Sequence, residues 1–270
     1  MGNLLATDFR RVFKDKLFWI TAILGVVFAL ITPLLYAVLF HGLDREMMTL
    51  MGVTVDAKSQ FFTAFHFGHN FGLVAPVLMA IVICKDFSYG TVRNKIIGGY
   101  SRASIFGAMF ITCGAMVFLL MLCHALLSLG CSLLFFPYQQ GDFTIGDFGY
   151  LVASLGLELL CYLFVTALVC CLCVTMKNVG LTVVVYVAVA FLMTLLVSVL
   201  QVASALVENE TLSKIVEFLC QFNVYYQVGQ IGSSDTYTAK QIISVVLSSV
   251  VPAVALGGLG LFCFRKKDLK

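Results

Sequence analysis

The sequence predicts an all-α membrane protein with about six transmembrane helices in one domain, residues 1–270. Two observations predict this class. Hydrophobic residues make up 61% of the chain and charged residues 11%, whereas a soluble domain is about 45–50% apolar and about 25% charged. In addition, apolar runs long enough to cross a bilayer as a helix recur along the chain. A chain of this composition has too little polar surface to fold alone in water.

Six runs approach or exceed the roughly 20 residues that a membrane-crossing helix needs. They lie at about 18–40, 65–84, 104–136, 150–175, 179–205 and 241–264. The third run is longer than one crossing requires, so we expect this helix to tilt or to project from the bilayer.

The basic residues alternate between the segments that join these runs. The N-terminus, the loop after the second run, the joint after the fourth and the C-terminus together hold 13 of the 17 Lys and Arg residues. The remaining segments hold Arg45, Lys58, Lys214 and Lys240. Because Lys and Arg collect on the cytoplasmic side, we expect a multi-pass plasma-membrane protein with both termini in the cytoplasm.

Two amphipathic segments are expected to lie along the membrane surface. In residues 4–17, apolar and charged residues take opposite sides of a helix that ends near Trp19. The apolar side holds Leu5, Phe9, Val12 and Phe13, and the charged side holds Asp8, Arg10, Arg11, Lys14 and Asp15. The alternative is a solvated tail. A second short helix is predicted within residues 206–240, on the outer face, beside a possible glycosylation sequon at Asn209.

Most cysteines lie inside the apolar runs, which predicts packing rather than disulfide bonding; they include Cys113, Cys123, Cys131, Cys161, Cys170, Cys171, Cys173 and Cys263. The cluster at 170–173 lacks the ligand spacing of a zinc site. We therefore expect no metal in this chain.

The loop after the second run predicts a docking element. Asp86 or Ser88 is expected to cap a short helix over 86–98, and Gly98 or Gly99 to end it. Val92 and Ile96 lie four residues apart, so they are expected to form an apolar ridge with cationic flanks, presented to the cytoplasm. Such a helix suits a groove on a soluble partner. The alternative is a plain basic loop, which the charge asymmetry predicts anyway.

The stretch from Asp86 to Lys95, closed by Ser101 and Arg102, resembles the permease subunits of type-2 ATP-binding-cassette (ABC) exporters. It is similar to the bacitracin and lantibiotic resistance permeases. The basic tail at 264–269 and the amphipathic helix before the first span also fit that group. Many members carry a proline before the final small residue and arginine, where this chain has 98–100 as Gly-Gly-Tyr.

The resemblance implies a cytoplasmic coupling helix that contacts an ABC ATPase subunit, and a second permease copy, identical or paralogous, within the bilayer. The residues implied at or beside the ATPase contact are Asp86, Gly90, Thr91, Val92, Arg93, Asn94, Lys95, Ile96 and Arg102. The chain has no phosphate-binding loop of its own. ATP and Mg would therefore be bound by the partner, this chain would have no catalytic residue and no cofactor, and no nucleic acid is expected.

Glu158 is the only acid within a predicted span. An ionisable residue inside a membrane is a functional candidate. It belongs to a stripe that is expected to face inward: Ser154, Glu158, Tyr162, Thr166 and Cys170. Glu158 and Tyr162, with His66 and His69 near the outer end of the second span, are the candidates for a substrate path. The alternatives are a helix contact for Glu158, and for the Phe-rich segment around the histidines an interfacial aromatic belt.

The resemblance implies an exporter permease that moves a peptide antibiotic, a drug or a lipid-like molecule out of the cell. The alternatives are an ATP-independent channel or transporter and an intramembrane enzyme. An enzyme would need clustered acids, histidines or metal ligands, and the chain has no His-Glu-x-x-His or paired-acid motif.

Overall fold

The fold is an all-α membrane bundle, here described from a computed structural model. The described residues form helices and no strand. They are 1–39, 56–67, 70–139, 144–176, 178–206, 210–232 and 236–266.

Within the described residues, six helices are long and apolar enough to cross a membrane, which confirms the predicted number. They are α2 (Lys16–Leu39), α5 (Asn70–Ser88), α7 (Arg102–Ser132), α8 (Ile145–Met176), α9 (Val179–Leu206) and α12 (Ala239–Lys266). Helices are expected here because lipid offers no hydrogen-bonding partner, so a spanning segment must pair its own backbone groups. The third span, α7, is long, as predicted. The fourth span, α8, is longer than predicted.

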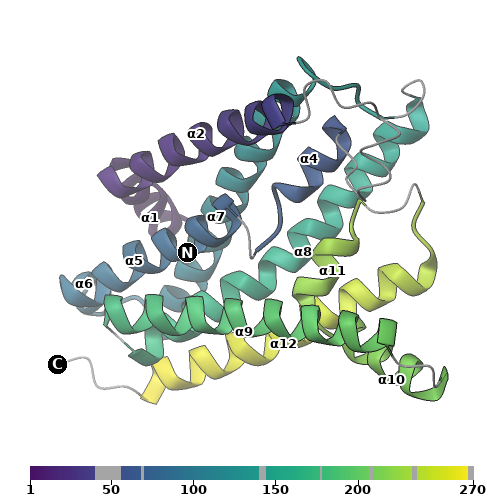
Figure 1. The fold of residues 1–270 in the computed structure, drawn as a ribbon. Helices are drawn as coiled ribbons and strands as arrows, with labels where there is room; N and C mark the ends of the chain where they lie inside the picture. The colour runs from purple at the N-terminus through teal and green to yellow at the C-terminus, as the bar shows by residue number, and fades with distance from the viewer. Residues whose placement is uncertain are drawn as a thin grey trace.

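The shorter helices lie at the ends of the bundle. They are α1 (Gly2–Lys14), α4 (Ala57–Thr63), α6 (Thr91–Ile97), α10 (Glu210–Gln221) and α11 (Val224–Gln230). In Figure 1, α1 and α6 lie at the end where the chain leaves α12, and α10 lies at the opposite end. We call these the α6 end and the α10 end. The predicted helices at 4–17 and after the fifth span correspond to α1 and α10, whereas α4 and α11 were not predicted.

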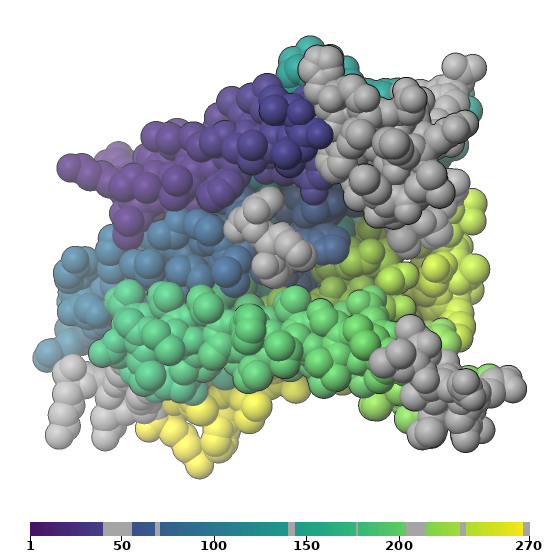
Figure 2. Space-filling model, viewed as in Figure 1, coloured from purple at the N-terminus to yellow at the C-terminus, as the bar shows by residue number. Residues whose placement is uncertain are grey.

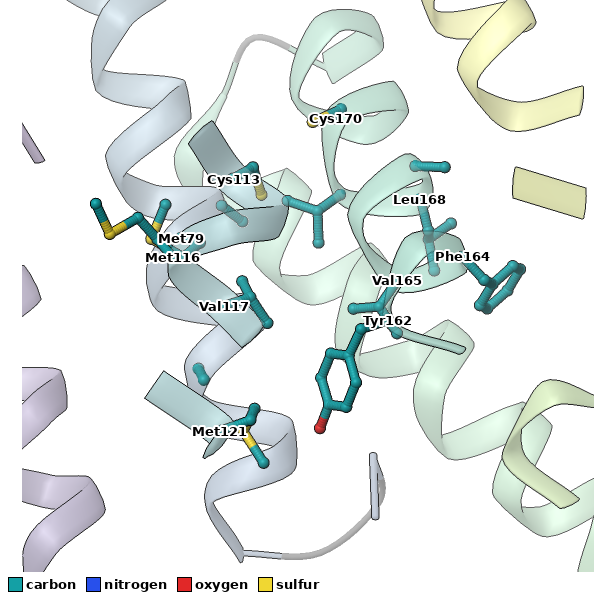
Figure 3. Close-up of a cluster of buried hydrophobic side chains, with 14 of the residues drawn as sticks. Met79, Cys113, Met116, Val117, Met121, Tyr162, Phe164, Val165, Leu168 and Cys170 are labelled. Carbon is teal, nitrogen blue, oxygen red and sulfur yellow. The ribbon is translucent and has the colours of Figure 1, made fainter. Parts of the chain in front are cut away.

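The six spans form an inner and an outer group. In α5, α7 and α8, 56–61% of the most apolar window is buried, against 11–22% in α2, α9 and α12. Figure 3 shows side chains of α7, such as Val117 and Met121, directed toward Tyr162 and Val165 of α8. The outer helices instead present apolar surface, as α9 does along the front of the molecule in Figure 2. Such a surface is suited to lipid or to another membrane subunit.

The Phe-rich segment before α5 is part of the protein interior. Phe61, Phe62, Phe65 and Phe67 are all at most 4% exposed. The alternative of an interfacial aromatic belt is therefore wrong for these four residues. The second span begins at residue 70 instead of 65. A separate helix, α4, precedes it, and Asp56 caps the start of α4 by accepting a hydrogen bond from the Ser59 amide. The chain then turns and places its rings against α7 and α8.

A polar contact attaches the outer helix α2 to this interior. The Nδ1 atom of His124, on α7, lies 2.8 Å from the carbonyl oxygen of Gly25. The ring of Phe71 lies tilted beside that of His124, with centroids 5.0 Å apart, and fills the space that a Cβ on Gly25 would occupy. His124 was not singled out from the sequence, since a lone histidine in an apolar run carries no motif.

Gly72 lies near the start of α5 and allows the turn that precedes α5 to pack closely against it. A Cβ atom at Gly72 would lie 1.9 Å from the carbonyl oxygen of His66. We expect Gly72→Ala to lower the stability of the protein by about 2 kcal/mol, because the turn must move to relieve the overlap. The thermal unfolding midpoint of the detergent-solubilised protein would measure the loss.

Gly257→Ala is the matched control for this substitution. Gly257 also lies within a span, and a Cβ there would meet no atom within 4 Å. Its midpoint should stay unchanged or rise slightly, because alanine is the better helix former. Equal losses in the two variants would contradict the close approach at Gly72.

Candidate functional site

The predicted docking segment is built as two helices joined by a glycine. Helix α5 continues to Ser88, and α6 runs from Thr91 to Ile97. Gly90 between them has φ +70°, a left-handed conformation that favours glycine. The prediction that Asp86 or Ser88 would cap a single helix over 86–98 is therefore wrong. The predicted end is confirmed, since Gly99 has φ +86° directly after α6.

The two faces of α6 differ in chemistry. Val92 is 3% exposed and Ile96 packs against the core, so the apolar ridge predicted to face the cytoplasm is turned into the protein. The exposed face instead carries Arg93, Asn94 and Ile97, the last of these 74% exposed. Tyr89, which precedes α6, is 76% exposed. A partner at this end would therefore meet one basic, one amide and two large apolar or aromatic side chains.

Three ion pairs join α1 to the segment that precedes and forms α6. Lys95 Nζ lies 2.6 Å from Asp8 Oδ1, and Lys85 Nζ lies 3.2 Å from Asp15 Oδ2. Arg11 pairs with Asp86 between them. We call this set the α1 clamp. Its charges alternate along α1 as acid, base, acid, and their partners on the other side have the opposite order of sign.

The α1 clamp corrects the predicted faces of α1. Asp8, Arg11 and Asp15 were placed on the solvent side, but Asp8 is 2% exposed and lies on the packed face with Leu4 and Val12. Arg10 and Lys14 remain exposed, as expected. The sequence contained a signal for this split: acid, base and acid at spacings of three and four residues share one side of a helix.

The pair of Lys95 with Asp8 is the most buried pair of the α1 clamp, so loss of either partner would leave the other charge buried and unpaired. Burial lowers the pKa of Lys95, and the Asp8 carboxylate partly offsets this by raising it. Arg11 shows the same balance, because burial lowers its pKa while Asp8 and Asp15 raise it. Both cations are therefore held charged next to carboxylates, at a site where an unpaired charge would be costly.

Arg102 binds the end of the last span. Its Nη1 atom donates hydrogen bonds to the carbonyl oxygens of Phe264 at 3.1 Å and of Arg265 at 2.7 Å. These carbonyls lie in the final turn of α12, where backbone oxygens lack helical partners. The guanidinium of Arg102 thus ties the start of α7 to the end of α12, beside the predicted docking segment.

The second group of predicted residues lies along α8. Ser154, Glu158, Tyr162, Thr166 and Cys170 are all at most 1% exposed, so the inward-facing stripe is confirmed. Both carboxyl oxygens of Glu158 lack a hydrogen-bond partner within the part of the chain that the structure describes. The Tyr162 hydroxyl, in contrast, donates to the carbonyl oxygen of Phe65 at 2.9 Å.

Aromatic rings lead from Tyr162 to a cavity between α9 and α11. The ring of Phe67 lies 4.9 Å from that of Tyr162 and 5.1 Å from that of Tyr225, measured between centroids. The cavity beyond has a volume of about 250 Å³. It is lined by His66, Phe67, Thr194, Val197, Ser198, Gln201, Tyr225, Tyr226, Gly229 and Gln230. His66 thus lines a mixed polar and aromatic pocket. The residues that α9 and α11 contribute to it carry no sequence motif. His69 lies outside the described residues.

The structure keeps the two groups of predicted residues apart. The docking residues belong to the α6 end, whereas Glu158 and Tyr162 lie within α8, and α11 lies in the half of the bundle nearer α10 (Figure 1). No group of three or more His, Cys, Asp or Glu side chains suited to a metal occurs among the described residues. The ten cysteines are free thiols, and most are buried, as their packing role predicts.

Comparison with known proteins does not assign a family to the chain. No protein-family model matches it, and no curated protein matches it.

We expect Asp8→Ala to destabilise the protein by about 3 kcal/mol, because the Lys95 side chain is only 10% exposed and would lose its carboxylate. Amide hydrogen exchange should also rise over residues 91–97, since α6 loses its anchor. Mass spectrometry of the detergent-solubilised protein would measure the exchange, and a thermal midpoint the stability.

Asp15→Ala is the matched control, because it removes the same charge from the residue that directly follows the same helix. The pair of Asp15 with Lys85 is more exposed, with side chains 22% and 28% accessible, and such pairs contribute at most about 1 kcal/mol. If both variants lost equal stability, or if exchange over 91–97 stayed unchanged in Asp8→Ala, the α1 clamp would not hold α6.

Proposed function

We propose that this chain is the membrane-spanning permease of an ATP-driven ABC exporter. The observation that carries the proposal is the presentation of α6. This short helix exposes Arg93, Asn94 and Ile97 at one end of the bundle, while the α1 clamp fixes its opposite face. A rigidly seated helix with an exposed mixed face suits a groove on a soluble partner. In this proposal the partner is an ABC ATPase that binds ATP and Mg.

The charge distribution supports a cytoplasmic α6 end in the plasma membrane. The basic residues of α1, of the 85–102 segment and of the last turn of α12 gather at this end, where Figure 1 also shows α6 and the end of α12. Lys and Arg are retained on the cytoplasmic side of membranes. Both termini would then be cytoplasmic.

The connections of α6 provide a route by which a partner's movement would reach the membrane. Helix α6 continues from α5 on one side and into α7 on the other, and both are inner helices. Arg102 extends the connection to α12. ATP-driven movement of the partner would therefore move the helices that pack directly on α8 and its buried stripe.

The cargo belongs to the proposal as well. We propose a peptide antibiotic, a hydrophobic drug or a lipid-like molecule, carried by two permease copies that are identical or paralogous. The exposed apolar surfaces of α2, α9 and α12 leave room for a second copy as well as lipid. His66 and Tyr225 in the 250 Å³ cavity, and Glu158 and Tyr162 on α8, are the proposed lining of the path.

One observation favours an ATP-independent transporter as the second candidate. Glu158 is fully buried in a span, and its carboxyl oxygens have no partner among the described residues. Isolated carboxyl groups inside a membrane often mark ion or proton pathways. In this alternative, the purified chain alone would catalyse flux.

The docking proposal predicts that an ABC ATPase encoded beside this chain co-purifies with it. The double variant Arg93→Glu and Ile97→Asp should reduce recovery of the ATPase at least about tenfold, because it reverses a charge and places a carboxylate in an apolar contact. Quantitative gel analysis of the detergent-solubilised complex would measure this. Val92→Asp is avoided, since it would disrupt folding.

Lys240→Glu, at the far end of α12, is the control for this experiment. It also reverses one exposed charge and should leave recovery of the ATPase unchanged. Full recovery of the ATPase with the double variant would rule out α6 as the docking helix. Flux through the chain without any ATPase would favour the second candidate.

Glu158→Gln separates a transport role from a structural one. Because the carboxyl oxygens of Glu158 make no hydrogen bond among the described residues, we expect the variant to keep or raise the thermal midpoint. Transport of cationic substrates in proteoliposomes should fall at least about fivefold, while ATPase recovery stays the same. A lowered midpoint with normal transport would assign Glu158 to helix packing instead.

A further inference from the structure

The outward face of the α1–α2 corner carries positive charge and aromatic rings. Arg10, Lys14 and Lys16 are all exposed. Phe13 and Trp19 lie among them, 42% and 55% exposed. We call these five residues the corner surface.

Acidic side chains are turned away from the corner surface. Residues 1–39 contain two acids, Asp8 and Asp15, and both belong to the α1 clamp on the opposite side of α1. The α1 clamp thus removes the negative charges of α1 into the protein and leaves its outward face purely cationic. In the sequence, residues 8–16 interleave four cations with two acids. The separation of the two signs of charge therefore comes from the fold and not from the composition.

The start of α2 fixes the depth of the corner surface. The apolar run of this span begins at Leu17, directly after Lys16, and continues to Leu39. The indole Nε1 of Trp19 donates a hydrogen bond to the carbonyl oxygen of Phe13 at 2.8 Å, which locks the corner between the two helices. Tryptophan at the start of a span lies at the level of the lipid headgroups. The three cations therefore lie at the same level as the lipid phosphates.

We propose that the corner surface binds the headgroups of anionic phospholipids. The cations supply charge for the phosphate and its neighbouring groups, and the rings of Phe13 and Trp19 enter the upper part of the acyl layer. An anionic lipid satisfies both features at once. Since the same helix holds α6 through the α1 clamp, a lipid bound here also favours the seated position of α1. The binding itself does not depend on the proposed export function.

Trp19 provides the measurement, because it is the single tryptophan of the chain. The full-length protein is placed in proteoliposomes of phosphatidylcholine and phosphatidylglycerol at equal fractions, with brominated acyl chains on one lipid or the other. We expect bromines on phosphatidylglycerol to quench Trp19 about two- to fivefold more strongly, because each basic residue near the surface enriches anionic lipid. The triple variant Arg10→Gln, Lys14→Gln and Lys16→Gln should reduce this ratio to about 1.

A matched control removes three charges from the same end of the molecule but leaves the corner surface intact. Arg93→Gln, Arg265→Gln and Lys266→Gln serve here, since all three side chains are exposed at the α6 end. This variant should keep the wild-type quenching ratio. Detergent thermal midpoints of both triple variants should stay unchanged, because none of the six side chains is buried.

Three results would overturn the proposal. Equal quenching by both brominated lipids around the wild-type protein would show that no anionic lipid is enriched. An unchanged ratio in the corner variant would show that these cations serve another surface, such as an acidic patch on a protein partner. Loss of preference in the matched control would assign the effect to overall charge at this end rather than to the corner surface.

Discussion

The α1 clamp is the interaction on which the arrangement of the α6 end depends. Three charge pairs connect a helix outside the bundle to the end of one inner span and to the short helix that follows it. Without these pairs, α6 would be attached to the protein mainly through Val92 and Ile96 and through its two glycine joints. The charges of α1 are thus divided by function, with one set used for internal attachment and another left at the surface.

The spans were predictable because their physical origin is local. A helix in lipid needs about 20 apolar residues, and this requirement is visible in any window of the sequence. It located four of the six spans to within two residues at their starts and missed the starts of the second and the fourth by five residues. At the second span, an apolar and aromatic run is divided by a turn. The side chains of Phe61 and Phe65 are as apolar as the side chains of a membrane span, so composition alone does not show where α4 ends and α5 begins.

The candidate site was less predictable, because it depends on which side of a short helix is buried. The stripe on α8 was predicted correctly, since its polar residues stand out against an apolar background. On α6 and α1 both sides carry charged residues, and the sequence does not say which charge finds a partner. Lys95, which the sequence places beside a partner contact only through resemblance, pairs with Asp8, 87 positions earlier in the chain. The cavity residues of α9 and α11 carry no motif, and only the fold brings them to the same cavity as Phe67.

Two glycines in the left-handed conformation, Gly90 and Gly99, flank α6 at its two ends. Gly90 and Gly99 have open space around them, so backbone torsion rather than crowding sets their conformation. Gly90 and Gly99 join α6 to its neighbours, and the pair of Lys95 with Asp8 holds the helix from the side. The face that α6 presents at the surface therefore depends on a helix that precedes the first span, far from α6 in the sequence.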